Sequence, residues 1–92
     1  MKNLEKVLKA FANIKRLQII ELLLEHDRLS LIQLSKELRL SYRSTSKHVR
    51  KLYECDILDR ESVQGEVRYS INRSLPKPAK SMLELVRETR LL

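Results

Sequence analysis

Hydrophobic residues recur near the start of the chain at the three- and four-residue spacing of an α-helix. The first apolar stripe predicts an amphipathic helix over residues 3–12. Asn13 can cap a second helix, which is expected to run to about Glu25 and is apolar around most of its circumference. Such a helix is usually buried, so we expect this segment to be the central helix of the core.

Two short helices joined by a tight turn are predicted in the middle of the chain. Ser30 and Gln33 have the spacing of a capping box, which opens a helix over residues 31–38. After the turn, Ser41 can cap a second helix over residues 42–54. One side of this second helix carries Thr45, His48, Val49 and Leu52, and the opposite side carries Arg43, Ser46, Lys47 and Arg50.

The hydrophobic period then changes. Two segments of strand-like composition, residues 57–58 and 67–71, flank the only glycine, Gly65, which suits a hairpin tip that needs positive φ. A last amphipathic helix is expected over about residues 77–91. Its apolar residues are Ala79, Met82, Leu83, Leu85 and Val86.

These elements predict a fold that is mainly α with a β-hairpin wing, in the order ααααββα. The two short helices form a helix-turn-helix over about residues 31–54, and the wing covers about residues 57–72. The whole chain, residues 1–92, is expected to be a single domain, because 92 residues are enough for one small core and no more.

The positive charge of the chain is concentrated in one region. The net charge is +7, and seven basic residues against one acidic residue lie between Arg28 and Lys51. Such asymmetry indicates a surface that binds a polyanion. A basic face that is merely solvated is the alternative interpretation from charge alone.

Composition excludes several classes of protein. One cysteine cannot form an internal disulfide or a zinc knuckle. No apolar run approaches the roughly 18 residues of a membrane span, and no secretion leader opens the chain. Paired acids, a glycine-rich phosphate loop and a nucleophile with a placed base are all lacking in the sequence. We therefore expect a cytoplasmic chain that is not an enzyme and has no cofactor and no membrane partner.

A basic helix after a tight turn is typical of DNA recognition, in which the second helix enters the major groove. Arg43 and Lys47 are one turn apart on the outward face, and an arginine can hydrogen-bond guanine in bidentate fashion. Ser44 and Ser46 can bind phosphate or base, and Arg68 can touch DNA from the hairpin.

The chain resembles the ArsR-type winged helix-turn-helix regulators. Residues 8–23, LKAFANIKRLQIIELL, are similar to the family's opening LKALADPTRLRILELL, and residues 40–52, LSYRSTSKHVRKL, resemble its recognition helix, LSQSTVSRHLKxL. CDIL at residues 55–58 stands where the family usually has AGLV. The resemblance covers about residues 4–72, and the last helix fits by position alone. Arg39 and Asp56 occupy positions where the family often has glycine.

The resemblance implies a homodimeric transcription regulator, most often a repressor, whose first and last helices form the dimer interface. It also implies which residues look toward DNA, namely Tyr42, Arg43, Ser44, Ser46, Lys47 and His48. The candidate DNA-binding residues are Tyr42, Arg43, Ser44, Ser46, Lys47, His48, Arg50 and Arg68. The candidate dimer-interface residues are Leu4, Val7, Leu8, Phe11, Met82, Leu83 and Val86.

Metal sensing of the kinds known in this family is not expected. Many members bind metals through cysteines in the helix before the turn, or through histidine and acidic residues in the last helix. Here residues 31–35 contain no thiol and residues 75–92 contain no histidine, and Cys55, His26 and His48 lie in different predicted elements. A metal site needs three or four converging ligands.

Several residues have two interpretations. His48 can pack inside the protein or contact phosphate, and Tyr42 can contact DNA or pack on the wing. Cys55 is expected to be a small buried hydrophobe at a helix end, with redox sensing as the alternative. The apolar stripes of the first and last helices can belong to the core of one chain, but a thin core favours a seam between two subunits.

The sequence therefore predicts a sequence-specific regulator that binds double-stranded DNA. The expected form is a homodimeric repressor that reads an inverted repeat through the helix over residues 42–54 in the major groove. The alternative is a winged-helix module for protein–protein interaction without DNA binding, against which the basic middle region argues.

Overall fold

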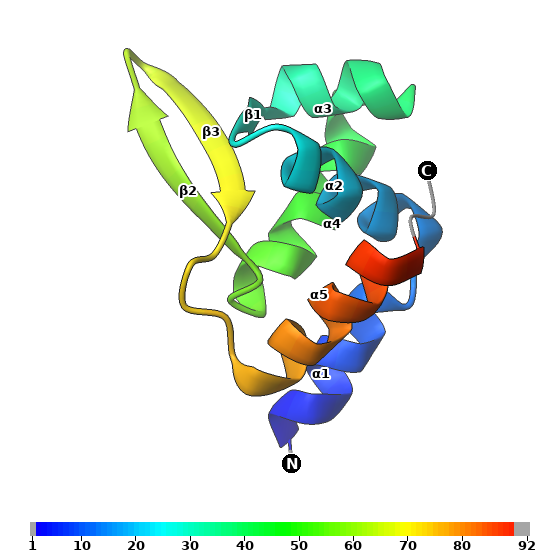
Figure 1. Ribbon diagram of the computed structural model, residues 1–92. Helices are drawn as coiled ribbons and strands as arrows, with labels where there is room; N and C mark the ends of the chain where they lie inside the picture. The colour runs from blue at the N-terminus through cyan, green and yellow to red at the C-terminus, as the bar shows by residue number, and fades with distance from the viewer. Residues whose placement is uncertain (1, 90–92) are drawn as a thin grey trace.

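The computed structural model describes the backbone of residues 2–89 and the side chains of residues 4–89. The described part has five helices and three strands (Figure 1). In chain order they are α1 (Lys2–Phe11), α2 (Ile14–Glu25), β1 (Leu29–Ser30), α3 (Leu31–Leu38), α4 (Tyr42–Glu54), β2 (Leu58–Val63), β3 (Glu66–Ile71) and α5 (Lys77–Thr89). The expected end of the last helix at residue 91 lies outside the described residues.

The central helix predicted from the sequence is confirmed. Asn13 caps α2, and its Oδ1 accepts a hydrogen bond of 3.1 Å from the backbone N–H of Arg16. Ile19 and Ile20 are fully buried, and the other helices and the sheet pack around α2. A helix that is apolar around its axis needs neighbours on every side, and this fold supplies them.

The helix-turn-helix begins and ends where the capping residues predict. The Ser30 hydroxyl accepts from the N–H of Gln33 at 3.2 Å, and the Ser30 N–H donates to the Gln33 side chain at 2.9 Å, which completes the capping box. Arg39 ends α3 in the left-handed conformation, with φ of 54°. Ser41 then caps α4 by accepting from the N–H of Ser44 at 3.0 Å. The basic helix is thus held in place by local interactions at its start.

The sheet contains one strand more than the sequence predicts. Its order is β1-β3-β2, and β3 pairs antiparallel with both neighbours. The predicted hairpin is present as β2 and β3, and the added strand β1 has only two residues, Leu29 and Ser30, too few to show a period of two in the sequence. The hairpin tip is as expected, since Gln64 and Gly65 both have positive φ, as a two-residue turn of type I′ requires.

The apolar stripes of the end helices are largely used within one chain. α1 and α5 lie side by side at one end of the molecule, away from the hairpin tip (Figure 1). Four of the seven residues expected at a subunit seam are buried in the core of this chain itself. These four are Val7, Phe11, Leu83 and Val86. Within one chain the core uses these four side chains, since α1 and α5 pack against each other, and their placement at a subunit seam stays a prediction.

Three of the candidate seam residues keep accessible surface. Leu8 is 43% exposed, and Leu4 and Met82 are partly buried. Leu85, which was not among the candidates, is 51% exposed on α5. Among the described residues, no helix combines the length and the apolarity that crossing a membrane requires.

Candidate nucleic-acid interface

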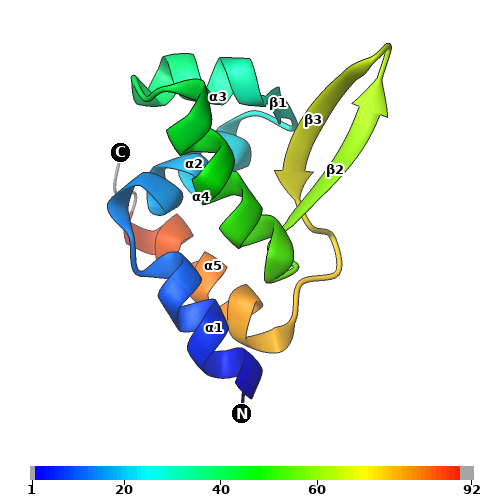
Figure 2. The same ribbon diagram turned by 180° about the vertical axis from the view of Figure 1, so that it is seen from behind.

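The two sides of α4 differ as the sequence predicts. Thr45, Val49 and Leu52 are buried, and they hold the helix against the core. The outward side carries the exposed basic residues Arg43, Lys47, Arg50 and Lys51. Figure 2 shows α4 in front of α2, with the hairpin beside it. A cationic helix that projects from a fixed scaffold suits the width of the DNA major groove.

The first turn of α4 is well ordered by its own side chains. Thr45 donates its hydroxyl hydrogen to the carbonyl of Ser41 at 2.9 Å, so this buried residue is satisfied locally. Ser44 and Ser46 are half-buried beside the exposed basic residues. Tyr42 is 59% exposed, which leaves its ring accessible at the start of the helix. The N-terminal end of α4 therefore presents accessible side chains beside free backbone N–H groups.

His48 faces the protein as well as the solvent. Its Nδ1 lies 3.4 Å from Nη1 of Arg16 on α2, and its side chain is half-buried. Burial lowers the pKa of His48, and the nearby positive charges of Arg16 and Lys15 lower it further. The contact supports the packing interpretation for one ring nitrogen and leaves the other nitrogen without a described partner.

This environment makes the stability of the fold depend on pH. Because the pKa of His48 is lower in the folded chain than its ordinary value of 6.5, the unfolded chain binds the proton more readily. The contribution of the neutral His48 ring to stability is then fully present above pH 6.5 and is lost as the pH falls through the lower pKa that the ring has in the folded chain. The urea midpoint should decrease from about pH 7.5 to about pH 5.5, and His48→Gln should flatten that decrease. An equal decrease in the variant would assign the effect to other groups.

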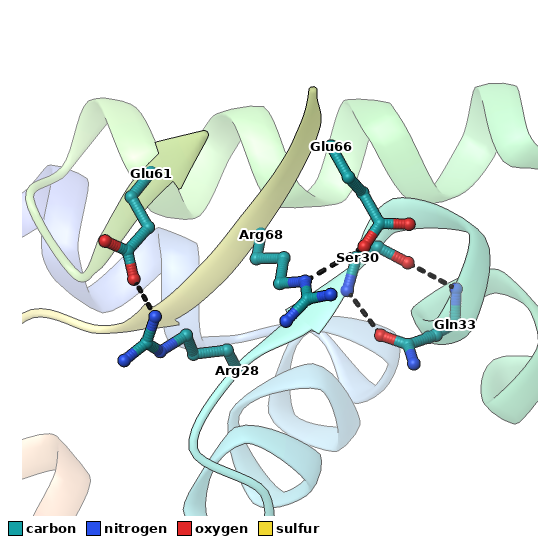
Figure 3. A network of polar contacts seen from close by, with 6 residues as sticks. All are labelled: Arg28, Ser30, Gln33, Glu61, Glu66 and Arg68. Carbon is teal, nitrogen blue, oxygen red and sulfur yellow. Dashed lines mark hydrogen bonds and ion pairs between the residues drawn. The ribbon is translucent and has the colours of Figure 1, made fainter. Parts of the chain in front are cut away.

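One ion pair connects the wing to the loop before β1, and a second lies within the wing itself (Figure 3). Arg28, in the loop after α2, pairs with Glu61 on β2, and Arg68 pairs with Glu66 on β3 at 2.9 Å. Arg68 lies opposite Ser30 in the sheet, so it sits beside the cap of α3. Both pairs are partly exposed and individually contribute about 0–1 kcal/mol. Only the pair of Arg28 with Glu61 joins the wing to another segment, because Arg68 and Glu66 lie on the same strand.

A further contact joins the wing to the recognition helix. The guanidinium of Arg60 on β2 lies over the ring of Tyr53 on α4, 4.6 Å from its centre. An arginine over an aromatic ring contributes about 0.5–1 kcal/mol at an exposed site. The wing and the recognition helix are therefore linked at the carboxyl end of α4.

Sequence reasoning missed Arg16 and Tyr53. Arg16 follows a capping asparagine, which predicts its backbone hydrogen bond but gives no indication of its side-chain partners. Tyr53 and Arg60 lie in different elements whose register only the fold decides. The alternation of the wing strand could have marked Arg60 as facing one side of the sheet.

Histidine, cysteine and acidic side chains can bind a metal ion, and a cysteine can also be a reactive thiol. No group of three or more histidine, cysteine or acidic residues in residues 4–89 could hold a metal ion. Cys55 lies at the end of α4, half-buried, with Sγ 3.8 Å from the carbonyl of Lys6. Burial raises the pKa of the Cys55 thiol, which favours its unreactive protonated form.

The chain is similar to known winged helix-turn-helix proteins. The family model for winged helix-turn-helix DNA-binding domains matches residues 13–59. HlyU from Vibrio cholerae N16961 is 31% identical, the match covers 95% of this chain and 90% of that chain, and the TM-score is 0.79. The transcriptional repressor PagR of Bacillus anthracis is 27% identical, with 92% and 93% covered and a TM-score of 0.76. A search of curated proteins found no match.

A more distant structure shares the fold. The homodimeric winged helix-turn-helix domain of Mb0332 from Mycobacterium bovis, described as a possible ArsR-family transcriptional regulator, is 19% identical. The match covers 97% of this chain and 79% of that chain, with a TM-score of 0.80. At this identity the likeness concerns the fold alone.

Proposed function

Because this chain belongs to the winged helix-turn-helix DNA-binding family, as its resemblance to ArsR-type regulators predicts, we propose that it is a homodimeric repressor that reads an inverted repeat. The chemistry is binding alone: α4 enters the major groove and the wing contacts the flanking backbone. Two α4 helices related by a two-fold axis would enter successive major grooves about 34 Å apart.

The observation that carries the proposal is the two-sided character of α4. Its apolar side is buried and its exposed side holds Arg43, Lys47 and Arg50, so the positive charge is held outward on a rigid element. Such a face attracts phosphate without sequence preference, and arginine adds discrimination at base edges. PagR, which is 27% identical to this chain, is a transcriptional repressor, and this likeness supports the repressor part of the proposal.

Each candidate DNA-binding residue has a defined part in the proposal. Arg43 and Lys47 face base edges, and Tyr42, Ser44 and Ser46 line the same end of the helix. The second ring nitrogen of His48 and the guanidinium of Arg50 contact phosphate. Arg68 exchanges Glu66 for a phosphate of the flanking backbone, which is favourable because the ion pair is partly exposed.

Two substitutions separate reading from general attraction. Arg43→Ala is expected to lower the affinity for a duplex selected from random DNA by about 1–3 kcal/mol more than it lowers affinity for random duplex. Arg68→Ala is expected to weaken binding to both duplexes equally, because phosphate contacts carry no sequence information. For each variant, competition titration at fixed salt measures the ratio of wild-type to variant affinity, once on the selected duplex and once on random duplex.

The matched control is Arg73→Ala, which removes the same charge from the exposed loop before α5. This variant should lower the affinity for both duplexes only slightly and equally, because it removes one charge that lies away from α4 and the wing. Equal losses for Arg43→Ala on both duplexes would reject its reading role. A wild-type protein that binds no duplex even in dilute buffer would favour the protein–protein interaction module instead.

A further inference from the structure

One arginine at the start of α2 binds the end of α1. Arg16 Nε donates to the carbonyl of Ala10 at 2.7 Å, and Nη2 donates to the carbonyl of Lys9 at 2.9 Å. Carbonyls in the last turn of a helix lack partners within the helix and lie at the negative end of its dipole. Because hydrogen bonds from an ionised donor are the stronger ones, Arg16 fixes the joint between α1 and α2.

The same guanidinium reaches the recognition helix. Its third nitrogen, Nη1, lies 3.4 Å from His48 Nδ1. Because an arginine can only donate, a hydrogen bond at this contact requires Nδ1 to be the acceptor, with the imidazole proton on Nε2. The lowered pKa of His48 agrees with this neutral ring, because burial and the charges of Arg16 and Lys15 all disfavour a second proton.

Other polar contacts between α1 and the α4 segment are sparse. Within residues 4–89, the one further contact of this kind runs from Cys55 Sγ, at the end of α4, to the carbonyl of Lys6 at 3.8 Å. A thiol is a weak donor, so it constrains the helices little. Arg16 therefore provides the stronger polar link between the helix beside α5 and the helix that carries the basic face.

We propose that Arg16 is a positioning residue that sets the orientation of α4 relative to α1, and thereby the separation of the two recognition helices in the dimer. This inference rests on the proposed function. If α1 lies at the dimer seam, a change in the angle between α1 and α4 moves both recognition helices away from their half-sites. Loss of the link then weakens discrimination between operator spacings and leaves general attraction to DNA intact.

Arg16→Lys is the sharpest single test. Lysine keeps the positive charge, but its compact ammonium cannot bind acceptors on two helices in the planar arrangement of a guanidinium. Affinity for the selected operator should fall about tenfold, whereas affinity for random duplex should stay within about twofold. An operator with one base pair inserted between half-sites should lose less affinity with Arg16→Lys than with wild type. Lys15→Ala, which removes a neighbouring charge, is the control and should preserve the spacing preference.

A double-mutant cycle tests whether Arg16 acts through His48. His48→Phe removes the acceptor of Arg16 and also the proposed phosphate contact of Nε2, so it should weaken binding to every duplex and, in addition, lose the spacing preference. His48→Gln supplies an acceptor oxygen for Arg16 and should retain much of the spacing preference. Adding His48→Phe to Arg16→Lys should cost no further spacing preference, because Arg16→Lys has already removed the contact that the two residues share. Fully additive losses of the spacing preference, or equal losses on operator and random duplex for Arg16→Lys, would overturn the proposal. Sedimentation should show dimers for every variant.

A readout without DNA separates this proposal from the proposed function. The ¹⁵N shifts of the His48 ring in the free wild-type protein should report an unprotonated Nδ1, and Arg16→Lys should shift the ring toward a mixture of tautomers. A protonated Nδ1 in the wild type, or no change in the variant, overturns the link. Wild-type protein that shows the expected tautomer but binds no duplex instead overturns the regulatory function.

Discussion

Leu8→Glu and Leu85→Glu are each expected to yield monomers that keep their helices and bind an operator about 10²–10⁴-fold more weakly. Leu8 is 43% exposed on α1 and Leu85 is 51% exposed on α5. Each extends the apolar side of its helix beyond the part that the chain buries. A charge at either position would have to be desolvated at a subunit seam, which costs several kcal/mol when it is unpaired. A monomer holds one recognition helix and loses the gain of binding two half-sites together.

The choice of these positions follows from the burial of their neighbours. Leu83 is only 6% exposed within a single chain, so Leu83→Glu would unfold the protein and could not report on the seam. Sedimentation measures the oligomer, circular dichroism the helices, and titration of a selected operator the affinity. Lys80→Gln is the matched control, since it changes the charge of α5 by the same amount at an exposed position away from Leu85. Unchanged dimers in both leucine variants would refute a seam at this end of the molecule.

The boundaries of α3 and α4 could be predicted because their signals are local. Ser30 with Gln33, and Ser41 alone, are capping residues whose hydrogen bonds span three residues, so no tertiary information is needed to find them. The same holds for the hairpin tip at Gly65, whose positive φ is a property of the residue. Sequence reasoning is strong where cause and effect lie within one turn of the chain.

The role of an apolar stripe could not be predicted in the same way. Periodicity shows that one side of a helix avoids water but does not show which surface covers it. From the sequence, Val7 and Leu83 are expected at a subunit seam, and the fold shows that both are already buried within one chain, in which α1 packs against α5. The contact of Arg16 with His48 joins residues that are 32 positions apart, and no spacing rule reaches that far. Sequence reasoning therefore found the candidate site on the exposed side of α4, but it did not find the contact from Arg16 on α2 that supports this helix.

A buried carboxylate in α2 is a cost that the rest of the core must offset. Glu21 is 1% exposed, in a helix that is otherwise apolar around most of its circumference. Its Oε1 has no hydrogen-bond partner among the residues that the structure describes. A buried acceptor without a partner loses its water and gains nothing in return, which costs about 1–3 kcal/mol. Leu17 and Leu24, one turn away on either side, pack against the core and supply no donor.

Glu21→Leu is therefore expected to raise the free energy of unfolding by about 1–3 kcal/mol, because leucine has a similar volume and removes the unsatisfied acceptor. For a domain of this size that corresponds to roughly 4–8 °C in Tm per kcal/mol. Urea titration at fixed protein concentration measures the change, with an unchanged slope showing that the unfolded state is unaffected. Glu25→Leu, at an exposed position one turn later, is the matched control and should change stability by no more than about 0.5 kcal/mol. A loss of stability in Glu21→Leu would mean that the carboxylate makes a needed contact, and affinity for the operator in the same variant would show whether that contact serves DNA binding.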